Sequence, residues 1–117
     1  MNAEKLKNRT KQLSIRIVRL FRSLPKTEEA RVIGRQLLRS ATSVAANYRA
    51  ACRARSSSEF VAKMGIVEEE ADETLFWLEI LAETKIVNEA LLKDLIIEYD
   101  EIVAIVVSSK KTARRKT

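Results

Sequence analysis

The sequence lacks histidine and has little glycine, proline, cysteine or aromatic character. Its 117 residues include two glycines, one proline, one cysteine and no histidine. Without histidine, the usual general base near neutral pH and the usual nitrogen ligand of transition metals are missing. Two glycines cannot build a glycine-rich phosphate loop, and the lone cysteine has no histidine with which to form a catalytic pair. The sequence therefore predicts a protein that is not an enzyme, needs no cofactor and binds no metal.

The single cysteine and the lack of long apolar runs indicate in which cellular compartment the protein is expected. Cys52 cannot form an intramolecular disulfide, and its neighbours are apolar at helical spacing, so we expect it to pack in the core of a cytoplasmic protein. The apolar stretch at residues 13–21 is interrupted by Arg16 and Arg19, which argues against a signal peptide. No run of about 18 uncharged apolar residues occurs, so we expect no membrane span.

Apolar residues recur at helical spacing in four segments, and the residues that interrupt helices fall between them. The periodicity predicts helices over residues 3–24, 28–54, 58–84 and 89–109. Pro25 ends the first helix, Thr27 offers an N-cap for the second, and a serine among residues 56–58 offers one for the third. Four amphipathic helices joined by short turns predict an all-α fold, an antiparallel up-down-up-down four-helix bundle over residues 1–109.

The expected core consists of the apolar positions that share one face of each helix. They are Leu6, Leu13, Ile17, Leu20 and Leu24; Ile33, Leu37, Ala41, Val44, Tyr48 and Cys52; Phe60, Met64, Val67, Ala71, Leu75, Leu78 and Ala82; and Leu91, Leu92, Leu95, Tyr99, Ile102, Val103 and Val106. Four other apolar residues, Ile15, Val18, Phe76 and Ile80, lie off these faces. Such residues are either scattered surface positions or a second contact surface, and we expect these four to form a subunit interface.

Charge is distributed very unevenly along the chain. Residues 1–55 carry 14 basic and 3 acidic side chains, whereas residues 56–107 carry 3 basic and 13 acidic ones. The last segment, residues 110–117, carries five positive charges and almost no apolar residue, so we expect a disordered basic tail. The sequence thus predicts an electrical dipole that ends in a cationic tail.

The second predicted helix separates its polar residues into two faces. One face, an arc about 80° wide, carries the arginines, which are Arg31, Arg35, Arg39, Arg49 and Arg53. The other is a line of small polar residues, which are Gln36, Ser40, Ser43 and Asn47. Because the sequence shows no pocket, we expect this polar line to be structural, its hydroxyls and amides fixing helix register by hydrogen bonds.

The same helix carries a family signature. The segment from Arg35 to Asn47, RQLLRSATSVAAN, followed by Arg53, Glu59 and Phe60, resembles the four-helix bundle proteins first noticed as reading frames inside intervening sequences of bacterial large-subunit ribosomal RNA genes. This resemblance implies a homopentamer and a role in nucleic-acid binding. The family is similar in fold to the accessory variability determinant protein of diversity-generating retroelements, a basic pentamer that works with a reverse transcriptase and RNA. A reverse transcriptase is therefore a partner that the resemblance implies.

Arginine binds phosphate through planar, paired donors, so the cationic residues form the predicted nucleic-acid-binding surface. It comprises the five arginines of the second helix, Arg55, and the tail residues Lys110, Lys111, Arg114 and Arg115. Our hypothesis is a homopentameric protein that binds RNA or DNA without reading sequence. The acidic third helix should lie beside the second, so the alternative is that arginines form salt bridges and the protein is a structural or protein-interaction scaffold.

Overall fold

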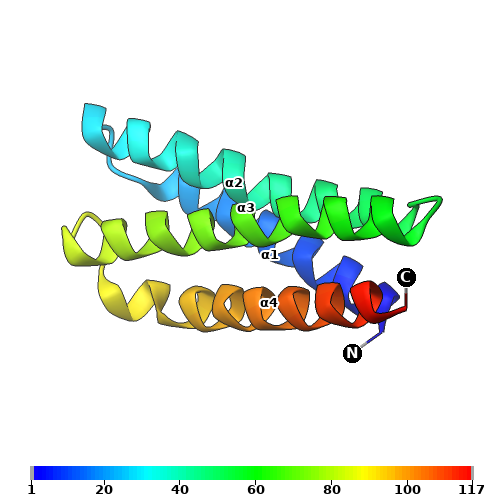
Figure 1. Ribbon diagram of the computed structural model, residues 1–117. Coiled ribbons are helices and arrows are strands. Elements are labelled where there is room, and N and C mark those ends of the chain that lie inside the picture. Colours follow the sequence, from blue (N-terminus) through cyan, green and yellow to red (C-terminus); the bar gives the residue numbers. More distant parts are fainter. Residues whose placement is uncertain (1, 117) are drawn as a thin grey trace.

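The structure, a computed structural model, describes residues 2–116 and consists of four antiparallel helices (Figure 1). They are α1 (Ala3–Ser23), α2 (Glu28–Cys52), α3 (Ser57–Glu83) and α4 (Glu89–Arg115). Each helix packs against the next in the chain, and the bundle is 48 Å long. The N-terminal end of α1 and the C-terminal ends of α2 and α4 lie at the same end of the bundle (Figure 1). The predicted all-α four-helix bundle is confirmed, and residues 2–116 contain no strand.

Side-chain caps fix where the helices begin. Thr27 accepts a hydrogen bond from the backbone N–H of Ala30 at 3.3 Å, and Ser56 accepts one from Glu59 at 3.1 Å, as predicted. Asn2 and Asn88 cap α1 and α4 in the same way. Each cap satisfies one of the backbone donors that the first turn of a helix leaves without an intrahelical partner. The ends of the first three helices lie within two residues of their predicted positions.

The core lies along the bundle axis and is built mainly from the predicted apolar faces. Ile17, Leu37 and Leu78 are fully buried. Two predicted core positions are wrong. Leu91 is 71% exposed, because it lies in the first turn of α4 at the edge of the apolar face, one residue before the buried Leu92. Cys52 is also exposed, because α2 ends there.

Buried hydroxyl groups hold α2 against both of its neighbours. Ser14 of α1 donates a hydrogen bond to the carbonyl oxygen of Ala41 at 3.1 Å, and Thr74 of α3 contacts the hydroxyl of Ser40 at 2.9 Å. Ser14, Ser40 and Thr74 are each less than 10% exposed. A buried hydroxyl without a partner is costly, so these paired groups favour one register of α2 against α1 and α3.

The basic segment after Ser109 is helical, which differs from the expected disordered tail. α4 continues to Arg115, and Lys116 caps it. Lys110 lies 2.6 Å from a carboxylate oxygen of Glu68 on α3, and this ion pair connects the last turns to the bundle. Cations are also favourable at the C-terminal end of a helix dipole. Met1 and Thr117, which the predicted domain boundaries include, lie outside the described residues.

Candidate nucleic-acid interface

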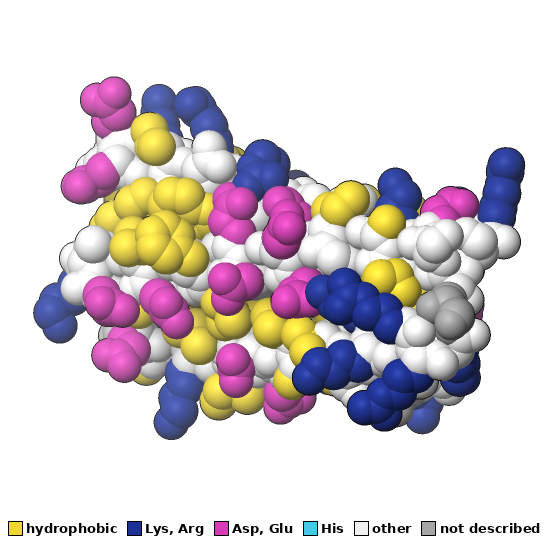
Figure 2. All heavy atoms as spheres, in the orientation of Figure 1, with side chains coloured by type: hydrophobic (Ala, Val, Ile, Leu, Met, Phe, Trp, Pro, Cys, Tyr) yellow, Lys and Arg dark blue, Asp and Glu magenta, His cyan; other side chains and the backbone are white. Residues whose placement is uncertain are grey.

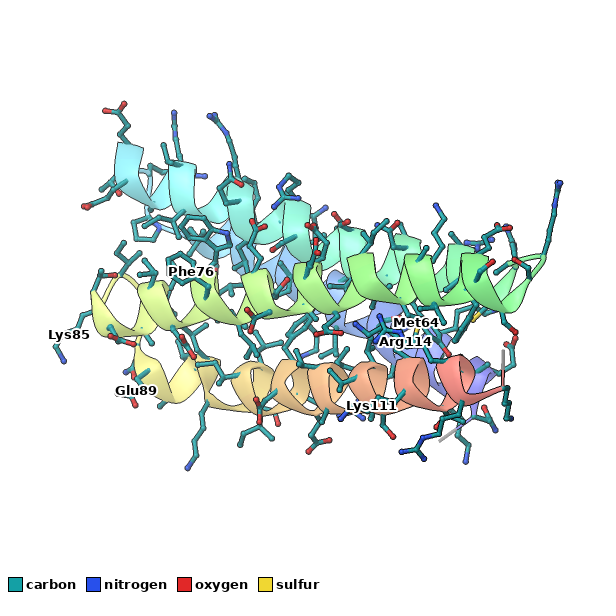
Figure 3. The ribbon with its side chains drawn as sticks, in the orientation of Figure 1. Met64, Phe76, Lys85, Glu89, Lys111 and Arg114 are labelled. Atoms are coloured by element: carbon teal, nitrogen blue, oxygen red, sulfur yellow. The ribbon has the colours of Figure 1, made fainter. Side chains whose placement is uncertain are left out.

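The ten predicted nucleic-acid-binding residues fall into three places along the bundle. Seven lie at the end where α2 and α4 finish, and we call this group the basic end; it comprises Arg49, Arg53, Arg55, Lys110, Lys111, Arg114 and Arg115. Figure 2 shows blue cationic side chains gathered there, and Figure 3 labels Lys111 and Arg114 among them. Arg31 and Arg35 lie near the opposite end, because Arg35 and Arg49 are about 21 Å apart along the helix axis. Arg39 lies between the two groups.

Arg39 is engaged with the acidic helix. Its guanidinium group donates a hydrogen bond to Glu70 at 2.8 Å and another to Glu73, both on α3. The Glu73 carboxylate also accepts a hydrogen bond from the Trp77 indole at 3.0 Å. The hydrogen bond from Trp77 and then that from Arg39 hold the pKa of Glu73 below its ordinary value of 4.5. Arg39 therefore joins α2 to α3.

The other five predicted nucleic-acid-binding arginines between residues 31 and 55 have no such ion pairs to the described residues. Within residues 2–116, no carboxylate lies in ion-pair contact with Arg31, Arg35, Arg49, Arg53 or Arg55, and all five are exposed. At the basic end Lys111 is likewise exposed and without an ion pair to the described residues, whereas Lys110 pairs with Glu68. Most of the predicted cations thus remain available to an external anion.

A groove between α1 and α2 extends the basic end, and the sequence alone did not predict it. It has a volume of about 490 Å³, and its cations are Lys7, Lys11 and Arg49. Small side chains such as Ala45 and Ala46 line the groove, so the surface is hollowed there. Lys7 pairs with Glu4 at 3.0 Å, which leaves Lys11 and Arg49 as the groove's cations without an ion pair to the described residues. The groove depends on how α1 is rotated about its axis relative to α2, and the apolar periodicity of α1 alone does not determine that rotation.

The predicted polar line does not act as one unit. Ser40 is buried and contacts Thr74 on α3. Asn47 donates hydrogen bonds to the carbonyl and hydroxyl oxygens of Ser43, within α2 itself. Gln36 accepts a hydrogen bond from Arg39 at 3.4 Å, again within α2. Within residues 2–116, Ser40 is the one member of this line that hydrogen-bonds to another helix.

The residues predicted to form a subunit interface differ in exposure. Phe76 on α3 is 50% exposed and packs edge-on against Trp77, with ring centroids 4.9 Å apart. Ile15, Val18 and Ile80 are half-buried. Figure 2 shows an apolar patch over α2 and α3 at the end opposite the basic end, and Figure 3 places Phe76 there. Part of an apolar surface is therefore left uncovered in the single chain.

Neither a metal centre nor a membrane-spanning helix is found in the part of the chain that the structure describes. No three His, Cys, Asp or Glu side chains among residues 2–116 are grouped so as to hold a metal ion. None of the described helices is long and apolar enough to cross a bilayer.

Comparison with known proteins places the chain in a family. A family model described as 23S rRNA-intervening sequence protein matches residues 4–108. A solved structure from Bacteroides thetaiotaomicron, described as a protein with unknown function from the S23 ribosomal protein family, is 32% identical to this chain. The match covers 95% of this chain and 99% of that one, with a TM-score of 0.87. A search of curated proteins finds no match. The family match spans most of the bundle, and the chain therefore belongs to the 23S rRNA-intervening sequence protein family.

Proposed function

We propose that this protein is a non-catalytic homo-oligomer that assembles as a pentamer. Its basic end binds nucleic acid, mainly RNA, without recognising base sequence. The observation that carries the proposal is the cluster of exposed cations at the basic end, where Arg49, Arg53, Arg55 and Lys111 have no ion pair to the described residues. Cations held on helices bind the phosphate backbone by charge, which is independent of base sequence.

The antiparallel topology favours this assignment. It places the last turns of α2 and α4 at one end and most of the acidic side chains of α3 elsewhere (Figure 2). An RNA that approaches the basic end therefore meets few carboxylates that would repel its phosphates. Cations of one sign gathered on a surface raise the local concentration of a polyanion and its rate of association.

Oligomerisation would strengthen a weak single site. A closed ring repeats the basic end around its symmetry axis, so several ends contact one RNA molecule together. The half-exposed Phe76 supplies apolar surface of the kind that a neighbouring subunit covers. The pentamer itself is supported by the family resemblance.

The test is RNA affinity measured by fluorescence anisotropy at two salt concentrations. We expect the logarithm of the affinity to fall linearly with the logarithm of salt, with a slope of about 0.7 to 0.9 per phosphate contact. Arg49→Gln with Arg53→Gln should weaken binding and reduce that slope by about one to two. A matched control is Lys85→Gln with Lys93→Gln, which removes two exposed cations near the opposite end and should leave binding unchanged.

The alternative, a scaffold that binds no nucleic acid, makes a different prediction. No RNA or DNA binding at low salt would contradict the nucleic-acid proposal and support the scaffold. Equal loss of affinity in the test and control variants would show that total charge, and not the basic end, governs binding.

A further inference from the structure

A second cationic hollow lies at the turn between α1 and α2, away from the basic end. Its volume is about 320 Å³, near the lower limit of about 300 Å³ for small-ligand sites. Four cations line it, namely Arg22, Lys26, Arg31 and Arg35, together with apolar side chains that include Phe21 and Leu24. We call this hollow the corner pocket. Two of its cations come from α2, one from the last turns of α1 and one from the connecting turn.

The charge of the corner pocket is not balanced by the protein. All four cations are exposed, and no described residue forms an ion pair with any of them. Glu28 and Glu29 line a neighbouring hollow with Val32 and Ile33, and neither lines the corner pocket. Four like charges around one cavity repel one another, so a bound dianion would lower their electrostatic energy.

The apolar part of the corner pocket is held in place by close helix packing. Phe21 is half-buried and Leu24 is 7% exposed. Both contact α2 at Gly34, where an added Cβ would lie only 2.6 Å from Leu24 Cδ1 and 3.1 Å from Phe21 Cδ1. The absence of a side chain at Gly34 therefore lets the two residues settle against α2. Arginines next to a fixed apolar surface form a mixed site, in contrast to a simple cationic patch.

We propose that the corner pocket binds a single unpaired nucleotide, with the base against the half-buried Phe21 and the phosphate among the four cations. A free inorganic anion would use the cations and leave the apolar surface unused. An apolar ligand would leave four cations without a counter-charge. A nucleotide uses both parts, because every base has an apolar face and every phosphate carries negative charge. The inference rests on the proposed function in one respect, since the natural source of the nucleotide is the RNA that the basic end holds.

The experiment is a titration of the ¹⁵N-labelled full chain, followed by NMR, with adenosine monophosphate, ribose 5-phosphate and inorganic phosphate in turn. We expect adenosine monophosphate to shift the amide signals of Phe21, Gly34 and Arg35. Because the base contacts an aromatic side chain, we expect the affinity for adenosine monophosphate to be at least about fivefold higher than that for ribose 5-phosphate. Arg31→Gln with Arg35→Gln should weaken its binding by about tenfold, because charge-assisted contacts to the phosphate are lost.

The control variant, Lys85→Gln with Lys93→Gln, removes two exposed cations that do not line the corner pocket and should leave the affinity for adenosine monophosphate unchanged. Equal affinity for the three probes would overturn the inference, since it would show a site for phosphate alone. Signal changes that avoid the corner pocket would also overturn it. The two proposals fail in distinguishable ways. If only the proposed function is wrong, the protein binds adenosine monophosphate at the corner pocket but does not bind RNA. If only this inference is wrong, the protein binds RNA but the corner pocket does not bind adenosine monophosphate.

Discussion

Gly34, in the second turn of α2, has a packing role that the sequence alone does not reveal. A methyl group there would lie 2.6 Å from Leu24 Cδ1, so the side chain of Leu24 would have to move. At Gly65, the other glycine, an added Cβ would meet nothing within 4 Å. The two positions therefore form a matched pair, in which helix propensity is the same and the available space differs.

We expect Gly65→Ala to raise the free energy of unfolding by about 0.5–1 kcal/mol, because alanine restricts the unfolded chain more than glycine does. Relative to that variant, Gly34→Ala should be less stable by about 1–3 kcal/mol, the usual cost of overpacking. Urea unfolding followed by circular dichroism measures both. Equal gains in the two variants would mean that the turn between α1 and α2 relaxes freely around the added methyl group.

At the residue scale the sequence predicted helix caps better than it predicted the corner pocket. The sequence predicts caps at Thr27 and at a serine among residues 56–58, which the structure places at Ser56, because a cap depends on residues only a few positions apart. The sequence does not predict the contact between Phe21 and Gly34, because it joins two helices and depends on how closely they approach each other. The same holds for the buried contact of Ser40 with Thr74, which lie 34 positions apart.

At the scale of elements, the ion pairs of Arg39 connect α2 to α3. The pKa of Glu73 is lowered in the folded protein, so the charged carboxylate favours folding. This contribution is fully present above the ordinary pKa of 4.5 and is lost as pH falls through the lower folded-state pKa. Its size is small, because the side chains of Arg39 and Glu73 are 49% and 33% exposed.

We therefore expect Arg39→Gln to raise the pKa of Glu73 and to reduce stability at neutral pH. The difference from the wild-type protein should shrink as the pH falls well below 4.5. Carboxylate NMR titration and urea unfolding at two pH values measure these effects. The control is Arg35→Gln, one turn earlier on α2 and without an ion pair to the described residues, which should show no such pH dependence. Identical pH profiles for the two variants would contradict the role assigned to Arg39.

Helix boundaries show what local patterns can and cannot predict. Helical periodicity and capping residues place three helix ends within two residues, because these signals lie inside each segment. The end of α4 was missed, since the composition after Ser109 is that of a disordered tail and the partner of Lys110 is Glu68 on another helix. Similarly, helical periodicity groups the four arginines of α2 and its C-cap, Arg53, on one face, but their spacing along the helix axis separates them into groups near opposite ends of the bundle.

At the scale of the whole molecule, the sequence predicted the separation of charge but not its direction in space. Counting charges by segment gives a basic first half and an acidic second half. Only the antiparallel arrangement brings the ends of α2 and α4 together into the basic end (Figure 1). The dipole thus runs partly along the long axis of a bundle that is 48 Å long.

We expect the apolar patch around Phe76 to hold subunits together. Phe76→Ser should reduce the mass measured by light scattering from that of a pentamer to that of smaller species, because a half-exposed aromatic ring is lost from the contact. Leu91→Ser is the matched control, since Leu91 is 71% exposed on α4 and is not among the predicted interface residues. A monomeric wild-type protein, or the same change in both variants, would contradict this interface.

The position of the described chain ends has a practical consequence. Asn2 and Lys116 both lie at the basic end, so a purification tag or a dye attached near either one would stand next to the cations under test (Figure 1). The turn around Lys85 is at the far end, and Lys85 points outward there (Figure 3). Attaching the protein to a sensor surface through that turn would leave the basic end accessible to RNA.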